Sequence, residues 1–245
     1  MKFLRTRVFF FISVLLIAGG LSAQGSYSLL WDIGKTNVSD GYFAKALSLG
    51  NYDWDNYSFA AGFQLDLKSA NPNTFSGASL QVGRRFSIYD QPIQAHAFFV
   101  LHRFSELLYE TNWGLLAETR HDNFRFQLGT GFRAYRYTRD AIDEYNINTN
   151  KTLRENFVIL YMMGYSLKPD DHHWSAGAAF TNIDRFIINQ ETNPLIMVHG
   201  TYRLTPRLRL DMEAWYKSAG AFNLSVNYFG FFVRSGLRWE LEAGS

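Results

Sequence analysis

The chain has 245 residues and no cysteine, and its 24 Lys and Arg against 22 Asp and Glu give a formal net charge of +2. The absence of cysteine excludes a disulfide scaffold, a thiol nucleophile and cysteine-ligated zinc. A chain that is 47% hydrophobic and 19% charged is not mostly disordered. Without a cluster of positive charge in the mature part, nothing supports binding to nucleic acid.

The first 23 residues have the three parts of a secretory signal peptide. Lys2, Arg5 and Arg7 precede an apolar run at residues 8–18, and a short stretch rich in small residues ends at Ala23. An uncleaved anchor is the alternative, but the apolar run is about 11 residues, whereas a helical span needs about 20. We predict a signal peptide at residues 1–23, cleavage after Ala23, and a single β-barrel domain at residues 24–245.

Period-two alternation dominates the mature chain. In residues 59–67, apolar side chains occupy every second position, while Gly62, Gln64 and Asp66 fall on the opposite face. This spacing is typical of a β-strand rather than of a helix. It recurs between turn signals, and we predict about 12 strands, with a range of 10 to 14. The predicted strands are residues 27–36, 42–50, 56–68, 76–88, 93–104, 109–120, 123–138, 155–168, 173–182, 195–204, 207–217, and one or two within 221–241.

The composition of the two strand faces indicates which one lines a water-filled interior. Glycines such as Gly77, Gly129 and Gly236 share the face that carries the charges, where they relieve crowding inside a barrel. A 12-stranded barrel is also too wide to fill with apolar side chains, so we expect water and long charged side chains inside. The predicted fold is therefore all-β: a closed, antiparallel, up-and-down transmembrane barrel. Residues 139–155 and 182–193 are predicted to be outer loops, opposite short periplasmic turns.

With this signal peptide, alternation through residues 27–241 and a last strand at residues 232–241, the chain resembles bacterial outer-membrane β-barrel proteins. The resemblance is one of architecture, and no motif selects a specific family. It implies a location in the outer membrane of a Gram-negative cell. It also implies outer-membrane lipid and the barrel-assembly machinery as partners, the latter for insertion.

The alternation assigns side chains to the lumen and to the lipid. The predicted lumen-lining residues are Asp66, Arg85, Glu110, Glu118, Arg125, Arg133, Arg203, Arg207, Arg209, Asp211, Glu213, Arg234, Arg238 and Glu240. The predicted membrane-facing residues are Phe59, Phe63, Leu80, Trp113, Phe126, Leu210 and Trp239. A charged lumen could select solutes, but the presence of both signs favours ion pairs that brace the wall.

Histidines are the other candidates for chemistry. His96 and His102 share one face of a predicted strand, and His199 lies on the polar side of another. Their spacing to serine or carboxylate matches no catalytic motif, so we predict no catalytic residues. His172 and His173 are adjacent in a predicted turn and point to opposite faces, which disfavours a shared metal. No cofactor and no metal site is predicted.

Three hypotheses on function follow. The favoured one is a non-enzymatic outer-membrane barrel, either a structural or assembly component or a narrow pore with a charged lumen. The second is a lipid-modifying or proteolytic barrel enzyme. The third is an exported soluble β-barrel that binds an apolar ligand, which requires the apolar face to point inward.

Overall fold

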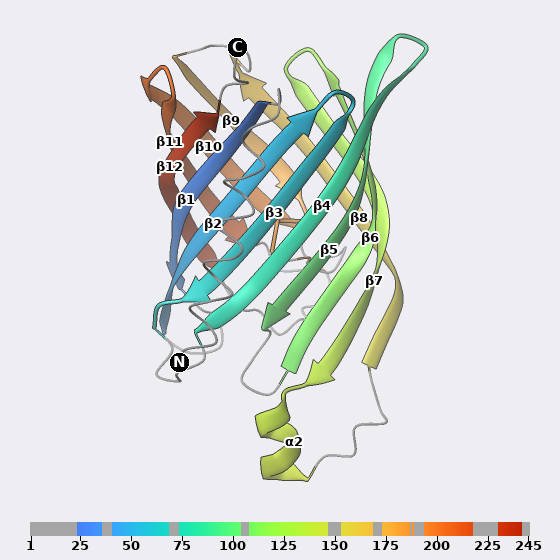
Figure 1. The fold of residues 1–245 in the computed structure, drawn as a ribbon, viewed down its shortest axis with the longest axis vertical. Helices are drawn as coiled ribbons and strands as arrows, with labels where there is room; N and C mark the ends of the chain where they lie inside the picture. The colour runs from blue at the N-terminus through green and yellow to red at the C-terminus, as the bar shows by residue number, and fades with distance from the viewer. Residues whose placement is uncertain are drawn as a thin grey trace.

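A computed structural model describes residues 24–35, 41–68, 74–103, 108–146, 153–168, 173–186, 188, 194–217 and 230–241. Within these ranges, twelve antiparallel strands follow one another in chain order around a closed barrel (Figure 1). The first and last strands close it, with a register that runs from Gly25 opposite Leu241 to Lys35 opposite Phe231. The predicted fold class is confirmed.

The strands lie close to the predicted ranges. Their bounds are β1 Gln24–Lys35, β2 Tyr42–Trp54, β3 Tyr57–Asp66, β4 Phe75–Ile88, β5 Gln91–Arg103, β6 Leu108–His121, β7 Phe124–Tyr137, β8 Leu153–Leu167, β9 Trp174–Thr181, β10 Leu195–Thr205, β11 Leu208–Lys217 and β12 Phe231–Leu241. The ambiguous region 221–241 thus contributes one described strand, β12. Its first part, residues 221–229, lies outside the described residues.

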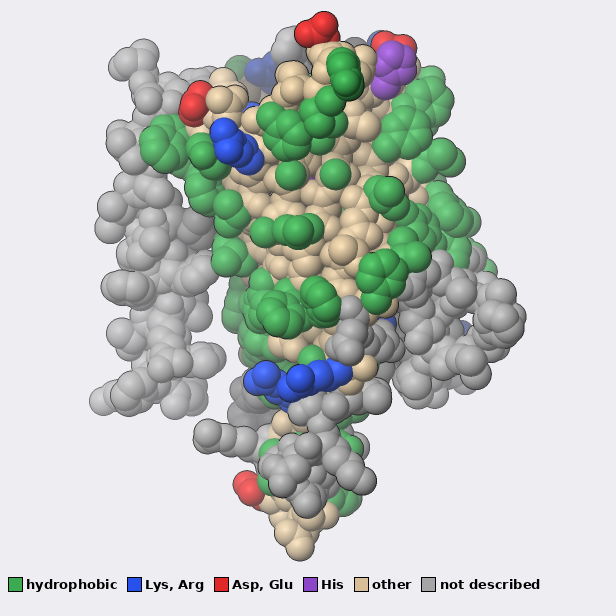
Figure 2. All heavy atoms as spheres, turned by 90° about the vertical axis from the view of Figure 1, so that its right-hand side faces the viewer, with side chains coloured by type: hydrophobic (Ala, Val, Ile, Leu, Met, Phe, Trp, Pro, Cys, Tyr) green, Lys and Arg blue, Asp and Glu red, His purple; other side chains and the backbone are tan. Residues whose placement is uncertain are grey.

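The apolar face of the alternation points outward. Leu80 on β4 and Trp113 on β6 are 53% and 57% exposed, whereas Gln64 on β3 and Arg234 on β12 are buried inside. In the view of Figure 2, apolar side chains are spread over the middle of the outer surface, and charged ones gather toward its two ends. This arrangement is the opposite of a soluble barrel, and it suits a wall in contact with acyl chains. Among the described residues, no helix is long and apolar enough to cross a membrane.

The two ends of the barrel carry connections of different length. At one end, here called the turn end, two residues join each of four strand pairs, at 55–56, 89–90, 122–123 and 206–207. Tyr89 and Asp90 both have positive φ (50° and 62°), the geometry of a type I′ turn that matches strand twist. The opposite, loop end carries longer connections, and the one between β7 and β8 contains the short helix α2, Arg139–Tyr145 (Figure 1).

The connection after β9 corrects a prediction. Residues 182–193 were expected to form an outer loop, but residues 182–186 and 188, here called the inner segment, lie inside the barrel. Asp184 and Phe186 are buried at 7% and 0% exposure, and both contact side chains of the barrel wall. Residues 187 and 189–193 lie outside the described residues. The prediction failed because a polar connection at a strand end shows by its sequence only that it is polar, and the lumen is polar too.

The interior also contains more apolar side chains than expected. Phe186 and Ile188 of the inner segment each join a buried apolar cluster, and a third cluster surrounds Trp215. The expectation of a lumen filled by water and charged side chains is therefore wrong for the half of the barrel at the loop end. The inner segment narrows the space, so inward-facing apolar side chains find partners there. The clusters are Phe98, Val100, Leu116, Val158, Leu160 and Ile188; Leu30, Leu47, Leu49 and Phe186; and Leu195, Trp215 and Phe232.

Candidate functional site

The interior of the barrel holds the charged residues, and the inner segment divides it into two parts. The loop-side half contains the inner segment and the ion pairs around Arg234. The turn-side half contains the charged residues between that level and the short turns, among them Glu118 and Arg238. The candidate site is described from the inner segment outward.

Asn182 directs the chain inward at the end of β9. Its side chain pairs with the backbone of β8 as a further strand residue would, with Nδ2 donating to Ile159 O at 2.7 Å and Oδ1 accepting from Tyr161 N at 2.9 Å. Its own N–H donates to Tyr161 O at 3.2 Å. Because the side chain satisfies the exposed edge of β8, the following residues can leave the wall without stranding buried backbone groups.

Phe186 anchors the inner segment by its shape. Its ring is fully buried among Leu30, Leu47 and Leu49, which project inward from β1 and β2. Opposite these residues, Gly62 on β3 provides the space, since a Cβ at this position would lie 2.7 Å from the Phe186 Cζ atom. Burying a phenylalanine side chain contributes about 1.5–3 kcal/mol, so the contact stabilises the inward position.

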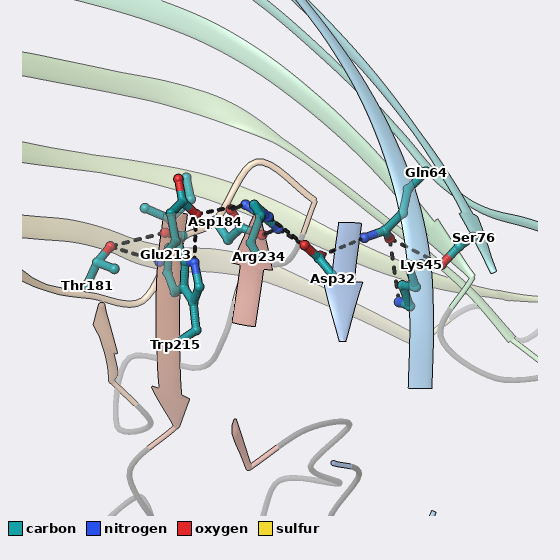
Figure 3. A network of polar contacts seen from close by, with 10 residues as sticks. Asp32, Lys45, Gln64, Ser76, Thr181, Asp184, Glu213, Trp215 and Arg234 are labelled. Carbon is teal, nitrogen blue, oxygen red and sulfur yellow. Dashed lines mark hydrogen bonds and ion pairs between the residues drawn. The ribbon is translucent and has the colours of Figure 1, made fainter. Parts of the chain in front are cut away.

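Arg234 on β12 anchors the segment by charge (Figure 3). Its guanidinium donates to both carboxylate oxygens of Asp184 at 2.9 Å each, and to both oxygens of Asp32 on β1 at 2.7 and 3.0 Å. Glu213 on β11 lies 3.4 Å from Nη1 and also accepts from Trp215 Nε1 at 2.8 Å. One buried cation therefore holds three carboxylates, and one of these belongs to the inner segment.

The same network continues across the wall. Gln64 on β3 donates to Asp32 Oδ2 at 3.4 Å, and its Oε1 accepts from Ser76 Oγ on β4 at 3.2 Å (Figure 3). Lys45 Nζ on β2 lies 3.5 Å from the same Oε1. These contacts link β1, β2, β3 and β4 on their inner faces. Paired charges and amides of this kind brace a wall, which fits the structural interpretation favoured from the sequence.

A second arginine holds the far end of the inner segment. Arg133 on β7 is buried, and its Nη2 donates to the carbonyl of Ile188 at 2.6 Å. Its Nε donates to Asn112 Oδ1 at 3.1 Å and lies 3.6 Å from Glu110 Oε1. The inner segment is thus held at Asp184, Phe186 and Ile188 by residues from several strands.

Charge also fixes the protonation state of the segment. Burial, the largest single influence, raises the pKa of the Asp184 carboxyl, but the charge and hydrogen bonds of Arg234 together with Arg185 outweigh it and hold that pKa below its usual value. Asp184 is consequently a carboxylate over the neutral pH range, and its two hydrogen bonds to Arg234 are charge-assisted.

The turn-side half is organised around Glu118 on β6. Its carboxylate accepts from Arg125 Nη2 at 2.7 Å, Gln127 Nε2 at 2.8 Å and Arg120 Nε at 3.1 Å. His96 Nε2 lies 3.9 Å away. Here one carboxylate faces two arginines, whereas three carboxylates surround Arg234.

The other predicted lumen residues are distributed as follows. Arg238 pairs with Asp211 at 3.0 Å, and Arg209 pairs with Glu240 at 3.1 Å. At the rim, exposed Arg85 pairs with Asp53, while Arg203 donates to Pro206 O in its own turn. Arg207 lies exposed in that turn rather than in a strand, and Asp66 is partly buried at the loop end of β3. Asp66 and Arg207 therefore belong neither to the ion pairs around Arg234 nor to the charged residues around Glu118.

The residues predicted to face the membrane are exposed or partly buried in the structure. Phe59, Leu80, Trp113, Phe126 and Trp239 are exposed, at 37% to 57%. Phe63 and Leu210 are half-buried, and Phe63 contacts the Phe75 ring with centroids 5.5 Å apart. None of the seven belongs to a buried cluster.

The histidines point inward but form no catalytic arrangement in the described residues. His199 Nε2 lies 3.5 Å from Ser166 Oγ, and its Nδ1 has no hydrogen-bond partner there, so no third group orients the ring. His102 is buried, and His96 fits over Gly83, where a Cβ would lie 2.5 Å from its Nδ1. The described residues contain no group of three potential metal ligands. His172 lies outside them.

Several site residues escaped the sequence analysis. Asp32, Lys45 and Trp215 sit on inner faces, but their strands were read without assigning these positions to the lumen. The period-two pattern carries the signal for all three. Asp184 and Phe186 follow the last strand residue of β9, where periodicity stops, so no pattern could place them.

Of the comparisons with known proteins, the one with solved structures found similar barrels. No protein-family model matches the chain, and neither does any curated protein sequence. Among solved structures, the KdgM porin is similar with a TM-score of 0.50 and 10% identity, over 87% of this chain and 98% of that one. The COG4313 outer membrane channel from Pseudomonas putida F1 (TM-score 0.46, 9% identity, 90% and 95% covered) and Omp33 from Acinetobacter baumannii (0.43, 12%, 90% and 99%) are also similar. The chain has the porin-like barrel fold of outer-membrane proteins and is assigned to no single family.

Proposed function

We propose that this protein is a non-enzymatic outer-membrane channel whose lumen is closed by its own inner segment. The observation that carries the proposal is the position of residues 182–186 and 188, which occupy the lumen although the barrel closes without them. A wall-bracing network needs no such segment. In the proposed mature protein, signal peptide 1–23 has been removed and the barrel spans the outer membrane.

The anchors of the inner segment support a movable plug more than a permanent core. It is held by the bidentate ion pair of Asp184 with Arg234, by the packing of Phe186 and Ile188, and by the hydrogen bond from Arg133 to the Ile188 carbonyl. In the described residues it continues no strand ladder beyond Asn182. Arg185 at its middle is exposed and donates to Asn51 Oδ1 at 2.9 Å. Displacement would leave the twelve-stranded wall intact. Solutes would then pass between inner faces that carry both signs of charge.

Single-channel recording tests the proposal. We expect small or rare currents from the intact protein in planar bilayers and larger ones from Phe186→Ala, which loses the aromatic anchor. Because the chain has no cysteine, Asn51→Cys with Arg185→Cys can be joined by a cleavable bismaleimide. Current should fall on cross-linking and return on cleavage.

The scaffold alternative makes the opposite prediction. The loop-side half of the lumen is packed, and a structural or assembly component would keep it so. Folded Phe186→Ala protein that carries no current, together with a silent variant lacking residues 183–188, would overturn the channel and favour the scaffold. Migration on gels before and after boiling shows whether each variant is folded.

A further inference from the structure

Arginines line the turn-side half of the lumen in two rows. Arg203, Arg209 and Arg238 are consecutive cross-strand partners on β10, β11 and β12. Arg120 and Arg125 are cross-strand partners on β6 and β7. Like charges directly opposite one another destabilise a sheet, so wall stability alone gives no reason to place them together.

The carboxylates around these rows do not neutralise them. Glu118 pairs with Arg120 and Arg125, Asp211 pairs with Arg238, and Glu240 pairs with Arg209 and Arg238. Arg203 donates to the carbonyls of Thr205 and Pro206 in its own turn. Five guanidinium groups against three carboxylates leave an excess of two positive charges. The loop-side half differs, since three carboxylates surround Arg234 there. Among these ion pairs, the positive excess lies in the turn-side half.

The guanidinium groups keep unused donors. Arg120 donates through Nε only and Arg125 through Nη2 only, and their other nitrogens have no partner among the described residues. The side chains are 66% and 42% exposed, so these donors can reach a solute. Nε of Arg125, although buried, also lacks a hydrogen-bond partner there.

From these observations we infer that the turn-side half of the lumen is a binding site for oxyanions, carboxylate or phosphate groups of a solute. The planar fork of a guanidinium matches both oxyanions through two parallel hydrogen bonds. Two rows on different strands would bind a solute with more than one anionic group. This inference rests on the proposed channel, since a closed scaffold would have no solute to bind, but binding can be measured without current.

Calorimetric titration of the detergent-solubilised protein with inorganic phosphate and with citrate tests the site directly. We expect at least one of the two to bind. Binding of citrate alone would identify a carboxylate site, binding of phosphate alone a phosphate site, and binding of both a site for either oxyanion. Arg120→Gln with Arg125→Gln, and Arg203→Gln with Arg209→Gln and Arg238→Gln, should each weaken binding about tenfold or more. Lysine at the same positions keeps the positive charge and should restore part of the binding. Arg84→Gln is the matched control, because Arg84 is exposed at the same end over the Tyr57 ring and belongs to neither row.

Absence of binding to the folded protein, or equal binding by the glutamine variants, overturns the oxyanion site. Bilayer recording under a potassium chloride gradient then separates the two proposals. A conducting protein that favours potassium over chloride refutes the inference and keeps the channel. A silent protein that still binds phosphate or citrate through these arginines refutes the channel and keeps the site.

Discussion

The two halves of the lumen pair their inward-facing charges in different ways. In the loop-side half, Arg234 is buried and pairs with three carboxylates, two on strands and one on the inner segment. In the turn-side half, arginines outnumber carboxylates and are half-exposed. The first half is built like a protein core and the second like a binding surface. The same alternating sequence pattern thus produces two different interiors. The inner segment marks the boundary between the loop-side half and the turn-side half.

The largest contrast should appear when each half loses one arginine. Arg234→Met leaves three carboxylates in a buried site without their cation, and removing one partner of a buried pair costs about 3–5 kcal/mol. Arg238→Met removes a more exposed pair, with side chains 29% and 15% exposed, so the loss of stability should be smaller. Both losses of stability can be measured as the temperature at which each variant begins to migrate on a gel like the boiled, unfolded protein. Equal losses would show that the halves do not differ in this way.

Truncating the aromatic anchor should affect the inner segment and spare the wall. Phe186→Ala removes a fully buried ring, with an expected cost of about 3–5 kcal/mol to the inward position. Protease cleavage within residues 182–188 should increase, while the gel shift of the barrel is retained. Phe157→Ala is the control, because Phe157 is 68% exposed on the outside of β8. If cleavage is unchanged, Phe186 does not hold the segment.

A side chain placed next to the Phe186 ring should also loosen the inner segment, but less than the loss of the ring does. Gly62→Ala places a Cβ 2.6 Å from Ser79 Oγ and 2.7 Å from the Phe186 ring, so the segment must shift, at about 1–3 kcal/mol. At Gly200, on the outer face of β10, a Cβ would meet nothing closer than 3.8 Å. We therefore expect protease sensitivity to rise in Gly62→Ala and to stay at the wild-type level in Gly200→Ala.

Acid should release the inner segment only at low pH. Because the folded pKa of Asp184 lies below the ordinary value of about 3.9, its ion pair with Arg234 adds stability above that value and loses it as the pH falls through the folded pKa. The part of the channel current that depends on Asp184 should therefore be constant from neutral pH to about pH 4 and rise below it. In Asp184→Asn that Asp184-dependent rise should be absent. A rise in wild-type current already near pH 6 would contradict this assignment.

The sequence predicted the wall well because its physics is local. Apolar side chains at every second position can face lipid only if the chain is extended, and paired backbone groups in lipid require the sheet to close. The strand bounds, the short turns such as Tyr89–Asp90 and the outward position of Leu80 and Trp113 all follow from neighbours in the chain.

Only the tertiary structure determined which residues fill the lumen. Asp184 meets Arg234 across 50 residues, and Asp32 meets it across 202, so neither contact leaves a periodic signal. The inner segment is polar and aperiodic in sequence, and only the shape of the cavity around Phe186 and the charge at Arg234 draw it inward. Alternation determines which way a side chain points, whereas closure of the barrel determines which side chains meet.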